Sequence, residues 1–447
     1  MDHTSLLILT TALFIIISIS STPCTSSHDP CPFSKPGPDL SIIHIYGKCS
    51  PFDPPKPDSS WPTTILNMAT KNDPKRISYL SSLATAQNKP TSAPIAPGHV
   101  INVGNYVVRA RIGTPGQLMF MVLDTSNDAA WVPCANCTGC SSNYSFAPNT
   151  SSTYGPVDCS GPECAQASGL SCPAAGPGPC LFNRTYGGDS SFSATLARDS
   201  FSLGNDVIPD YAFGCVGSVS GSSVPAQGLL GLGRGSLSLL AQSGARYSGI
   251  FSYCLPSFKS YYFSGSLRLG PLGQPKSIKT TPLLKNPHRP SLYYVNLTGV
   301  SVGRVNVPVD PTLLDFDPNT GAGTIIDSGT VITRFVRPVY DLVRDEFRRQ
   351  VKGPFSSLGA FDTCFAATND ELAPVITFRF TGMDLKLPTE NSLIHSSSGS
   401  LACLAMAAAP DNVNSVLNVI ANLQQQNLRI VFDTVNSRLG IAREVCN

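Results

Sequence analysis

The chain has 447 residues, more than one hydrophobic core commonly holds, so at least two domains or lobes are expected. Only 13% of the residues are charged, and glycine and proline are plentiful, which fits a turn-rich β protein better than a helical one. A formal net charge of +2 offers neither a basic surface nor an acidic tail, so no nucleic-acid partner is expected.

The N-terminus has the pattern of a secretory signal peptide. Residues 6–19 form one apolar run that ends in Ser20 and Ser21 and is too short to span a bilayer comfortably. We therefore predict a signal peptide over residues 1–22. Asp2 and His3 stand where Lys or Arg is usual, which leaves an uncleaved anchor as the alternative. No later segment resembles a transmembrane helix or a C-terminal lipid-anchor signal, so no membrane anchor is expected.

Residues 23–96 differ from the rest of the chain and read as a removable prosegment. Proline and serine cluster in PCTSSHDPCPFSKPGP and SPFDPPKPDSSWP, and a helical stretch at 71–90 carries Lys71, Lys75 and Arg76. A flexible stalk is the alternative interpretation.

From residue 100 onward the pattern is strand and turn. The runs NYVVRARIG and LMFMVLD are closed by GTPGQ, and further short strands follow in YAFGCVG, GSLRLG, LYYVNLTGVSVG and ITFRF. The best helical signal covers residues 337–351, with an expected buried face of Val339, Leu342, Val343, Phe347 and Val351. We predict a mainly all-β fold with few helices.

The cysteines and N-x-S/T sequons support export. The chain has 15 cysteines, and zinc binding by CANCTGC is the weaker alternative to disulfides because no histidine lies between His99 and His288. The pairing is left open by spacing alone. The disulfide candidates are Cys134, Cys137, Cys140, Cys159, Cys164, Cys172, Cys180, Cys215, Cys254, Cys364, Cys403 and Cys446. The glycosylation candidates are Asn136, Asn143, Asn149, Asn183 and Asn296.

The chain repeats one two-part pattern. The run MVLD, ending in Asp124, is followed further along by GLLGLGRGSLSL, and the run TIID, ending in Asp327, is followed by NVIANLQQQNLRIVFD. Each copy predicts one lobe, with an aspartate turn and then an apolar-apolar-Gly/Ala strand. Asp-Thr also occurs at Asp362 and Asp433, without this pattern.

Two aspartates that face each other across a cleft would share a proton, because their mutual repulsion raises one pKa. One carboxylate then acts as a general base toward water and the other as a general acid toward a carbonyl oxygen, which hydrolyses peptide bonds without metal or cofactor. The small residues after each aspartate allow a tight loop with its N–H groups turned to the carboxylate. The residues predicted to support these loops are Thr125, Ser126, Asn127, Ser328, Gly329 and Thr330.

From about residue 100 the sequence resembles the pepsin-like aspartic proteases, in particular the plant nepenthesin-type branch. The resemblance rests on IGTP before Asp124, Trp131 after it, TYGGDSS, GLLGLGRGSLSL, IIDSGT and QQQNLRIVFDT.

The resemblance implies a bilobal fold with an N-terminal lobe at 97–270, which contains the cysteine-rich insertion, and a C-terminal lobe at 271–447. It also implies secretion as a zymogen, a catalytic pair Asp124 and Asp327, and a substrate-covering flap with Tyr186 and Gly187 at its tip, supported by Trp131. From the residues alone, Tyr186 could equally be an exposed turn tyrosine and Trp131 a core residue. A prosegment Lys or Arg is expected to pair with the aspartates, and Lys71, Lys75 and Arg76 remain candidates.

Three positions depart from the family pattern. Ser126 replaces a glycine, Asn127 replaces a serine, and Ala421 ends the second apolar strand in place of glycine. Ser126 keeps the backbone N–H that the loop needs, and its Cβ is harmful only where φ is positive or space is lacking. We predict an altered but active site, with a catalytically silent secreted binding or inhibitor protein as the alternative.

The sequence thus predicts a secreted, monomeric aspartic endopeptidase that cleaves protein or peptide substrates at acidic pH. It needs no metal or cofactor. The extracellular space (apoplast) is the expected location, and the vacuole is the alternative.

Overall fold

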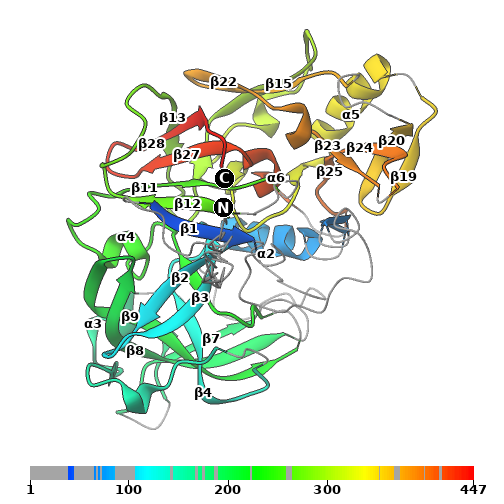
Figure 1. The fold of residues 1–447 in the computed structure, drawn as a ribbon. Coiled ribbons are helices and arrows are strands. Elements are labelled where there is room, and N and C mark those ends of the chain that lie inside the picture. The colour runs from blue at the N-terminus through cyan, green and yellow to red at the C-terminus, as the bar shows by residue number, and fades with distance from the viewer. Residues whose placement is uncertain are drawn as a thin grey trace, which may run out of the picture. The chain divides into compact units, whose positions relative to one another are not determined.

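The computed structural model describes residues 39–44, 65–66, 69–70, 73–85, 106–140, 144–166, 170–173, 177–185, 190–221, 224–257, 264–351, 353–366, 373–396, 398–411 and 415–446. The signal peptide, Lys71, the flap-tip residues Tyr186 and Gly187, and Asn143 lie outside these residues, as do the first three cysteines. Strands dominate the described part, and its two long helices are α2 (Asp73–Thr85) and α5 (Arg337–Val351) (Figure 1). None of the helices within these ranges is long and apolar enough to cross a membrane.

The N-terminal half of the sheet system runs from β2 to β12. Strand β2 pairs antiparallel with β3, β3 pairs parallel with β10, and β4 connects β10 to β9. The long strands β8 and β9 form a hairpin, and β7 and β6 extend it. The bounds are β2 (Tyr106–Ile112), β3 (Gln117–Asp124), β4 (Trp131–Thr138), β5 (Gly155–Pro156), β6 (Leu170–Ser171), β7 (Leu181–Thr185), β8 (Ser191–Leu203), β9 (Asp206–Ser220), β10 (Leu229–Gly231), β11 (Ile250–Cys254) and β12 (Ser264–Leu269), with α3 (Pro162–Gln166) and α4 (Leu239–Gln242).

The C-terminal half, β13 to β28, repeats the central part of this arrangement. Strand β17 pairs parallel with β26, as β3 does with β10, and β18 pairs with both β26 and β25. Two further four-stranded sheets have the orders β16-β15-β21-β22 and β19-β20-β24-β23. The bounds are β13 (Lys279–Leu284), β14 (Tyr294–Val295), β15 (Leu297–Val302), β16 (Val305–Asn306), β17 (Gly323–Ile326), β18 (Thr333–Phe335), β19 (Ser356–Leu358), β20 (Phe361–Ala366), β21 (Ile376–Phe380), β22 (Met383–Lys386), β23 (Leu393–His395), β24 (Leu401–Leu404), β25 (Met406–Ala408), β26 (Leu417–Ile420), α6 (Asn422–Gln425), β27 (Leu428–Asp433) and β28 (Arg438–Arg443).

Six strands join the two halves through consecutive antiparallel pairs in the order β1-β12-β11-β27-β28-β13. The first of them, β1 (Asp39–His44), comes from far upstream in the chain and also pairs with β2. In Figure 1 this blue strand lies between β12 and β2. A segment predicted to be removable therefore contributes a strand to the central sheet.

The predicted helix at 337–351 is confirmed as α5. Its buried residues are Val339, Tyr340, Val343 and Phe347, which pack toward β15, β18 and β25. The prediction that Leu342 belongs to the buried face is wrong, because its side chain is 37% exposed. The buried face of the helix is therefore narrower than expected. It includes Tyr340 and leaves the side chain of Leu342 exposed.

Candidate active site

The two aspartates of the sequence repeat occupy matching places in the fold. Asp124 is the last residue of β3, and Gly231 of the parallel strand β10 is its register partner. Asp327 directly follows β17, and its N–H donates to the carbonyl of Ile420 at the end of β26. Both side chains are fully buried. Because parallel strands end at the same edge of a sheet, each half delivers its aspartate at a strand end, backed by an apolar neighbouring strand.

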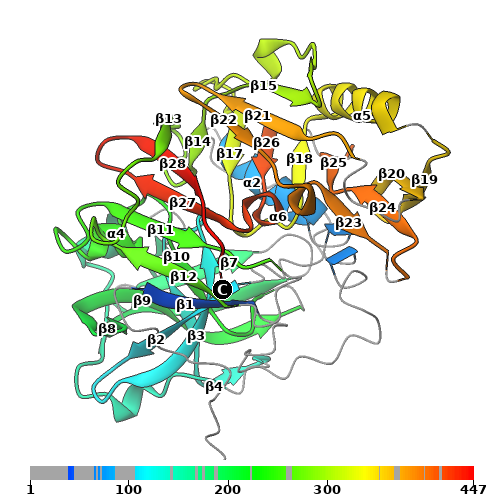
Figure 2. The same cartoon turned by 45° about the horizontal axis from the view of Figure 1, so that its top comes forward.

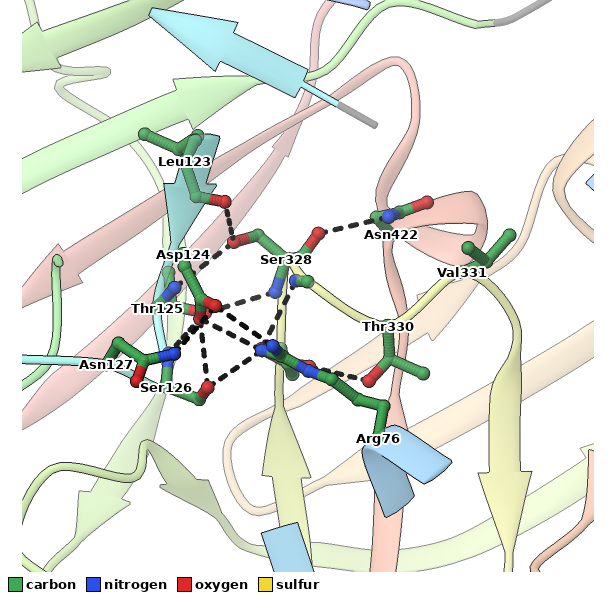
Figure 3. A network of polar contacts seen from close by, with 12 residues as sticks. Arg76, Leu123, Asp124, Thr125, Ser126, Asn127, Ser328, Thr330, Val331 and Asn422 are labelled. Carbon is green, nitrogen blue, oxygen red and sulfur yellow. Dashed lines mark hydrogen bonds and ion pairs between the residues drawn. The ribbon is translucent and has the colours of Figure 1, made fainter. Parts of the chain in front are cut away.

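The two aspartate loops are locked together by exchanged hydrogen bonds (Figure 3). The Ser328 N–H donates to Thr125 Oγ1 at 3.0 Å, and the Thr125 N–H donates to Ser328 Oγ at 3.3 Å. The Ser328 hydroxyl donates in turn to the carbonyl of Leu123 at 3.1 Å. These reciprocal bonds are buried, so they fix one loop against the other and hold the carboxylates face to face.

Each carboxylate is held by donors of its own loop. Asp124 Oδ1 accepts from the N–H of Ser126 at 2.8 Å and from its hydroxyl at 2.9 Å, and Asp124 Oδ2 accepts from Asn127 Nδ2 at 2.8 Å. Asp327 accepts from the Gly329 N–H at 3.2 Å and from Thr330 Oγ1 at 2.6 Å. Three donors thus hold Asp124 and two hold Asp327, and the two from Ser126 favour the ionised form of Asp124.

The positions that depart from the family pattern fit without strain. Ser126 does not have a positive φ, and its side chain bonds to Asp124 rather than colliding with it. A Cβ on Gly231 would lie 2.0 Å from the Asp128 carbonyl oxygen, so the first half requires glycine there. Ala421, the corresponding residue of the second half, is buried with φ −97°, and its N–H donates to Thr333 Oγ1.

Arg76 of α2 lies between the two carboxylates. Its Nη1 and Nη2 donate to Asp124 Oδ2 and Oδ1, both at 2.9 Å, while Nη2 and Nε donate to Asp327 Oδ1 and Oδ2 at 2.8 and 3.1 Å. Nη2 also donates to Ser126 Oγ at 2.7 Å. Arg76 is buried, and a Cβ on Gly329 would come within 2.2 Å of Nη2, so glycine is needed for this approach.

The charges of this cluster stabilise one another. Burial alone would raise the pKa of Asp124, but Arg76, and then the bonds from Ser126, outweigh burial and lower it. Burial alone would lower the pKa of Arg76, and the two carboxylates instead hold it well above its usual value. Arg76 therefore forms an ion pair with each of the two buried carboxylates.

A second acidic anchor holds α2, and sequence reasoning missed it. The buried Asp73 accepts from the N–H groups of Val331 and Ile332 at 2.9 and 2.8 Å, directly after the loop of Asp327. Burial raises the pKa of Asp73 to about 6, against the opposing effect of Arg334 and of the two N–H bonds. Below these anchors, Ile77, Leu80 and Ala84 pack against residues of β14, β17 and β26, and Figure 2 shows α2 beside β17 and β26.

Of the two basic candidates within the described residues, the structure brings Arg76 and not Lys75 to the aspartates. Lys71 lies outside the described residues, and Lys75 is half-buried elsewhere on the helix, where burial lowers its pKa. The helical periodicity could have identified Arg76 as the residue that faces the aspartates, because Arg76, Leu80 and Ala84 recur every four residues on one helix face.

The predicted flap region is described at its base. Strands β7 and β8 pair up to Thr185 and Ser191, and the tip between them lies outside the described residues. Trp131 is buried at the start of β4 with its ring 4.8 Å from that of Phe192, which lies on β8. Trp131 is thus a core residue beneath the hairpin, and its predicted support of Tyr186 remains a prediction.

All twelve disulfide candidates are paired. Cys159, Cys164 and Cys172, the one group of three metal-ligating side chains within reach of one another in the described ranges, belong to these bridges. The pairs are Cys134–Cys215, Cys137–Cys140, Cys159–Cys172, Cys164–Cys180, Cys254–Cys446 and Cys364–Cys403. Six disulfides indicate passage through the secretory pathway.

Of the sequon asparagines, Asn136, Asn149 and Asn183 are exposed. Asn296 is half-buried and donates to Thr381 Oγ1.

Two interlocked aspartate loops on a duplicated, mainly β scaffold define the class of pepsin-like aspartic proteases. Residues 106–271 match the family described as xylanase inhibitor N-terminal, and residues 292–443 match the one described as xylanase inhibitor C-terminal. The fold is similar to that in the structure titled "Crystal structure of edgp", with a TM-score of 0.61 and 20% identity over 80% of this chain and 97% of that one.

The curated relatives narrow the class. The chain is 61% identical to "Aspartyl protease AED3" of Arabidopsis thaliana over 97% of this chain and 98% of the relative. It is 53% identical to "Aspartyl protease 25" of Oryza sativa subsp. japonica, over 88% and 93% of the two chains. It is 35% identical to "Aspartic proteinase nepenthesin-1" of Nepenthes gracilis, over 77% and 78%. The chain belongs to the pepsin-like aspartyl protease family of plants, in its nepenthesin-type branch, and is an aspartic-type endopeptidase. These relatives favour the enzyme over the catalytically silent alternative.

Proposed function

We propose that Asp124 and Asp327 are the catalytic pair of this endopeptidase and that it hydrolyses protein or peptide substrates at acidic pH. The observation that carries the proposal is the pair of buried carboxylates, held face to face by the exchanged bonds of Thr125 and Ser328. Without Arg76 between them, two such carboxylates cannot both ionise easily and share one proton in acid.

The reaction follows from that shared proton. The ionised aspartate takes a proton from a bound water as the water oxygen attacks the substrate carbonyl carbon, and the protonated aspartate gives its proton to the carbonyl oxygen. The tetrahedral diol then collapses, the C–N bond breaks, and the leaving nitrogen takes up a proton. One chain supplies every group used in these steps, so we propose that the enzyme acts as a monomer.

The second part of the proposal is that residues 23–96 are a prosegment and that the structure represents the latent precursor. Three features support this: Arg76 fills the space between the carboxylates, Asp73 caps the neighbouring loop, and β1 completes the central sheet. A substrate carbonyl cannot reach either aspartate until Arg76 leaves.

Acid weakens this latch through the catalytic pair. Arg76 pairs with both carboxylates and lowers the pKa of Asp124, so its binding is strongest where the carboxylates of the free site are ionised. As the pH falls, the free pair retains a proton that Arg76 must displace, and binding weakens. Asp73 has the opposite effect on the release of α2. Burial raises its pKa to about 6, so the carboxylate takes up a proton as the pH falls through that value, and the free-energy cost of burying its charge declines.

We further propose that the mature protein is secreted to the extracellular space and glycosylated at the exposed Asn136, Asn149 and Asn183. The disulfides support export, and these three asparagines are accessible in the fold.

The test is hydrolysis of a denatured protein by acid-matured enzyme from pH 3 to 7. Asp124→Asn and Asp327→Asn should each lower the rate by about 10² to 10⁴-fold, because each removes one proton-transfer group. Asp362→Asn is the matched control, since Asp362 also precedes a threonine but lies on β20, hydrogen-bonded to Tyr340. Equal activity of all three variants and the wild type would refute the proposal.

A further inference from the structure

The side chain of Ser126 contacts both Asp124 and the position between the carboxylates. Arg76 Nη2 marks that position, at 2.9 Å from Asp124 Oδ1, 2.8 Å from Asp327 Oδ1 and 2.7 Å from Ser126 Oγ. It is the only guanidinium nitrogen that bonds to all three residues. Ser126 is 4% exposed, so its hydroxyl belongs to the interior of the site.

Once the proposed prosegment has left with Arg76, this position is free for an attacking water. Nη2 is a hydrogen-bond donor of about the size of a water molecule, and it stands in for a water bound to the two facing carboxylate oxygens. A water there would lie within hydrogen-bond distance of Ser126 Oγ. The serine hydroxyl donates to Asp124 Oδ1, so its lone pairs can accept from the water, as they accept from Nη2.

The hydroxyl makes the pair asymmetric. Its counterpart in the second half, Gly329, contributes only its N–H to Asp327, and it has no side chain to reach the water. A donor to Asp124 that Asp327 lacks stabilises the ionised form of Asp124. The same geometry therefore distinguishes the two aspartates.

We propose that Ser126 is a third catalytic residue, which holds the attacking water and keeps Asp124 ionised as the base. This inference rests on the proposed catalytic pair. In the step, the water donates one proton to Asp124 and its oxygen bonds to the carbonyl carbon, while its second O–H donates to Ser126 Oγ. Asp327 supplies the proton for the carbonyl oxygen, and Ser126 keeps its own proton throughout.

The other titratable groups near the pair are the same in the wild type and in every Ser126 variant, and burial raises the pKa of one of them, Asp128, so the test compares profiles rather than reading one profile alone. Arg76 and Asp73 leave with α2, and Asp128 turns its carboxylate to the Gly235 N–H and the Ser291 hydroxyl. Tyr253 of β11 lies near Asp327, and burial raises its pKa well above the range of the assay.

The experiment compares acid-matured wild type with Ser126→Gly, Ser126→Ala and Ser126→Thr over pH 2.5 to 7. Glycine and alanine should move the acidic limb of kcat/KM upward by about half to one pH unit. They should also lower kcat about tenfold with KM unchanged, as expected for one lost hydrogen bond in the reacting state. Threonine keeps the hydroxyl and should restore both. Agreement between alanine and glycine separates the hydroxyl from the space that the Cβ occupies.

A second readout does not depend on turnover. Carboxyl ¹³C shifts of aspartate-labelled matured protein, with Asp124→Asn to assign the signal, should show the Asp124 pKa rising in Ser126→Ala. Superimposable pH profiles or an unchanged Asp124 titration in Ser126→Ala would overturn the inference. Lack of turnover by the wild type would refute the proposed function alone, and the ¹³C titration would then decide the effect of the hydroxyl.

Discussion

At the scale of single residues, the site depends on which polar atom faces which carboxylate. Asp124, Asp327 and their interlocking residues were predicted, because an aspartate after an apolar run, repeated once, is visible in the sequence. The role of the Ser126 side chain was not, since the sequence indicates that a Cβ is present but not where Oγ points. Its contact with Arg76 joins residues of separate elements, and spacing carries no information about it.

Arg76→Ala should make the precursor mature at higher pH and faster than the wild type. The change leaves two buried carboxylates facing each other without their cation, so the bound state loses its main electrostatic support. Gel-based processing rates from pH 7 to 4 measure the effect, with Lys75→Ala as the control on the same helix. Identical rates for Arg76→Ala and wild type would show that Arg76 is not the latch.

At the scale of elements, the amphipathic patterns of the sequence predicted the positions of several strands and of one helix. Strands β2, β3 and β21 and helix α5 lie where the sequence placed them, because their apolar periodicity reflects one buried face. The pattern failed for Leu342, since the width of the buried stripe depends on the strands beneath it. The role of α2 was only half visible, because its polar residues Asp73 and Arg76 share the buried face with Ile77 and Leu80.

Asp73→Ala should also release α2 more readily. It leaves the N–H groups of Val331 and Ile332 buried without an acceptor. Because Asp73 takes up a proton near pH 6 in the bound state and so opposes acid release, the variant should mature at higher pH and with a steeper pH dependence. Maturation rates across pH 7 to 4, with Ser78→Ala as control, measure both. A shallower dependence would contradict the assigned direction.

At the scale of the whole molecule, β1 and α2 form one continuous structure with the two halves that carry Asp124 and Asp327. Strand β1 pairs with β12 on one side and with β2 on the other, and Arg76 of α2 lies between Asp124 and Asp327. The disulfide Cys254–Cys446 links the C-terminal residues to β11 of the central sheet. The sequence predicted two halves and a removable segment. It could not predict the disulfide pairing or the insertion of β1, because both are set by contacts between distant parts of the chain.

The most direct test of the central claim, that Asp124 and Asp327 are the catalytic pair and Arg76 occludes it, is binding of pepstatin measured by calorimetry. Its central hydroxyl mimics the tetrahedral intermediate and must occupy the position now held by Arg76 Nη2. Precursor and acid-matured protein are compared at the most acidic pH at which the precursor stays intact. We expect tight binding to the matured protein, its loss in matured Asp327→Asn, and no binding to the precursor. Equal affinity for precursor and matured protein would contradict the account.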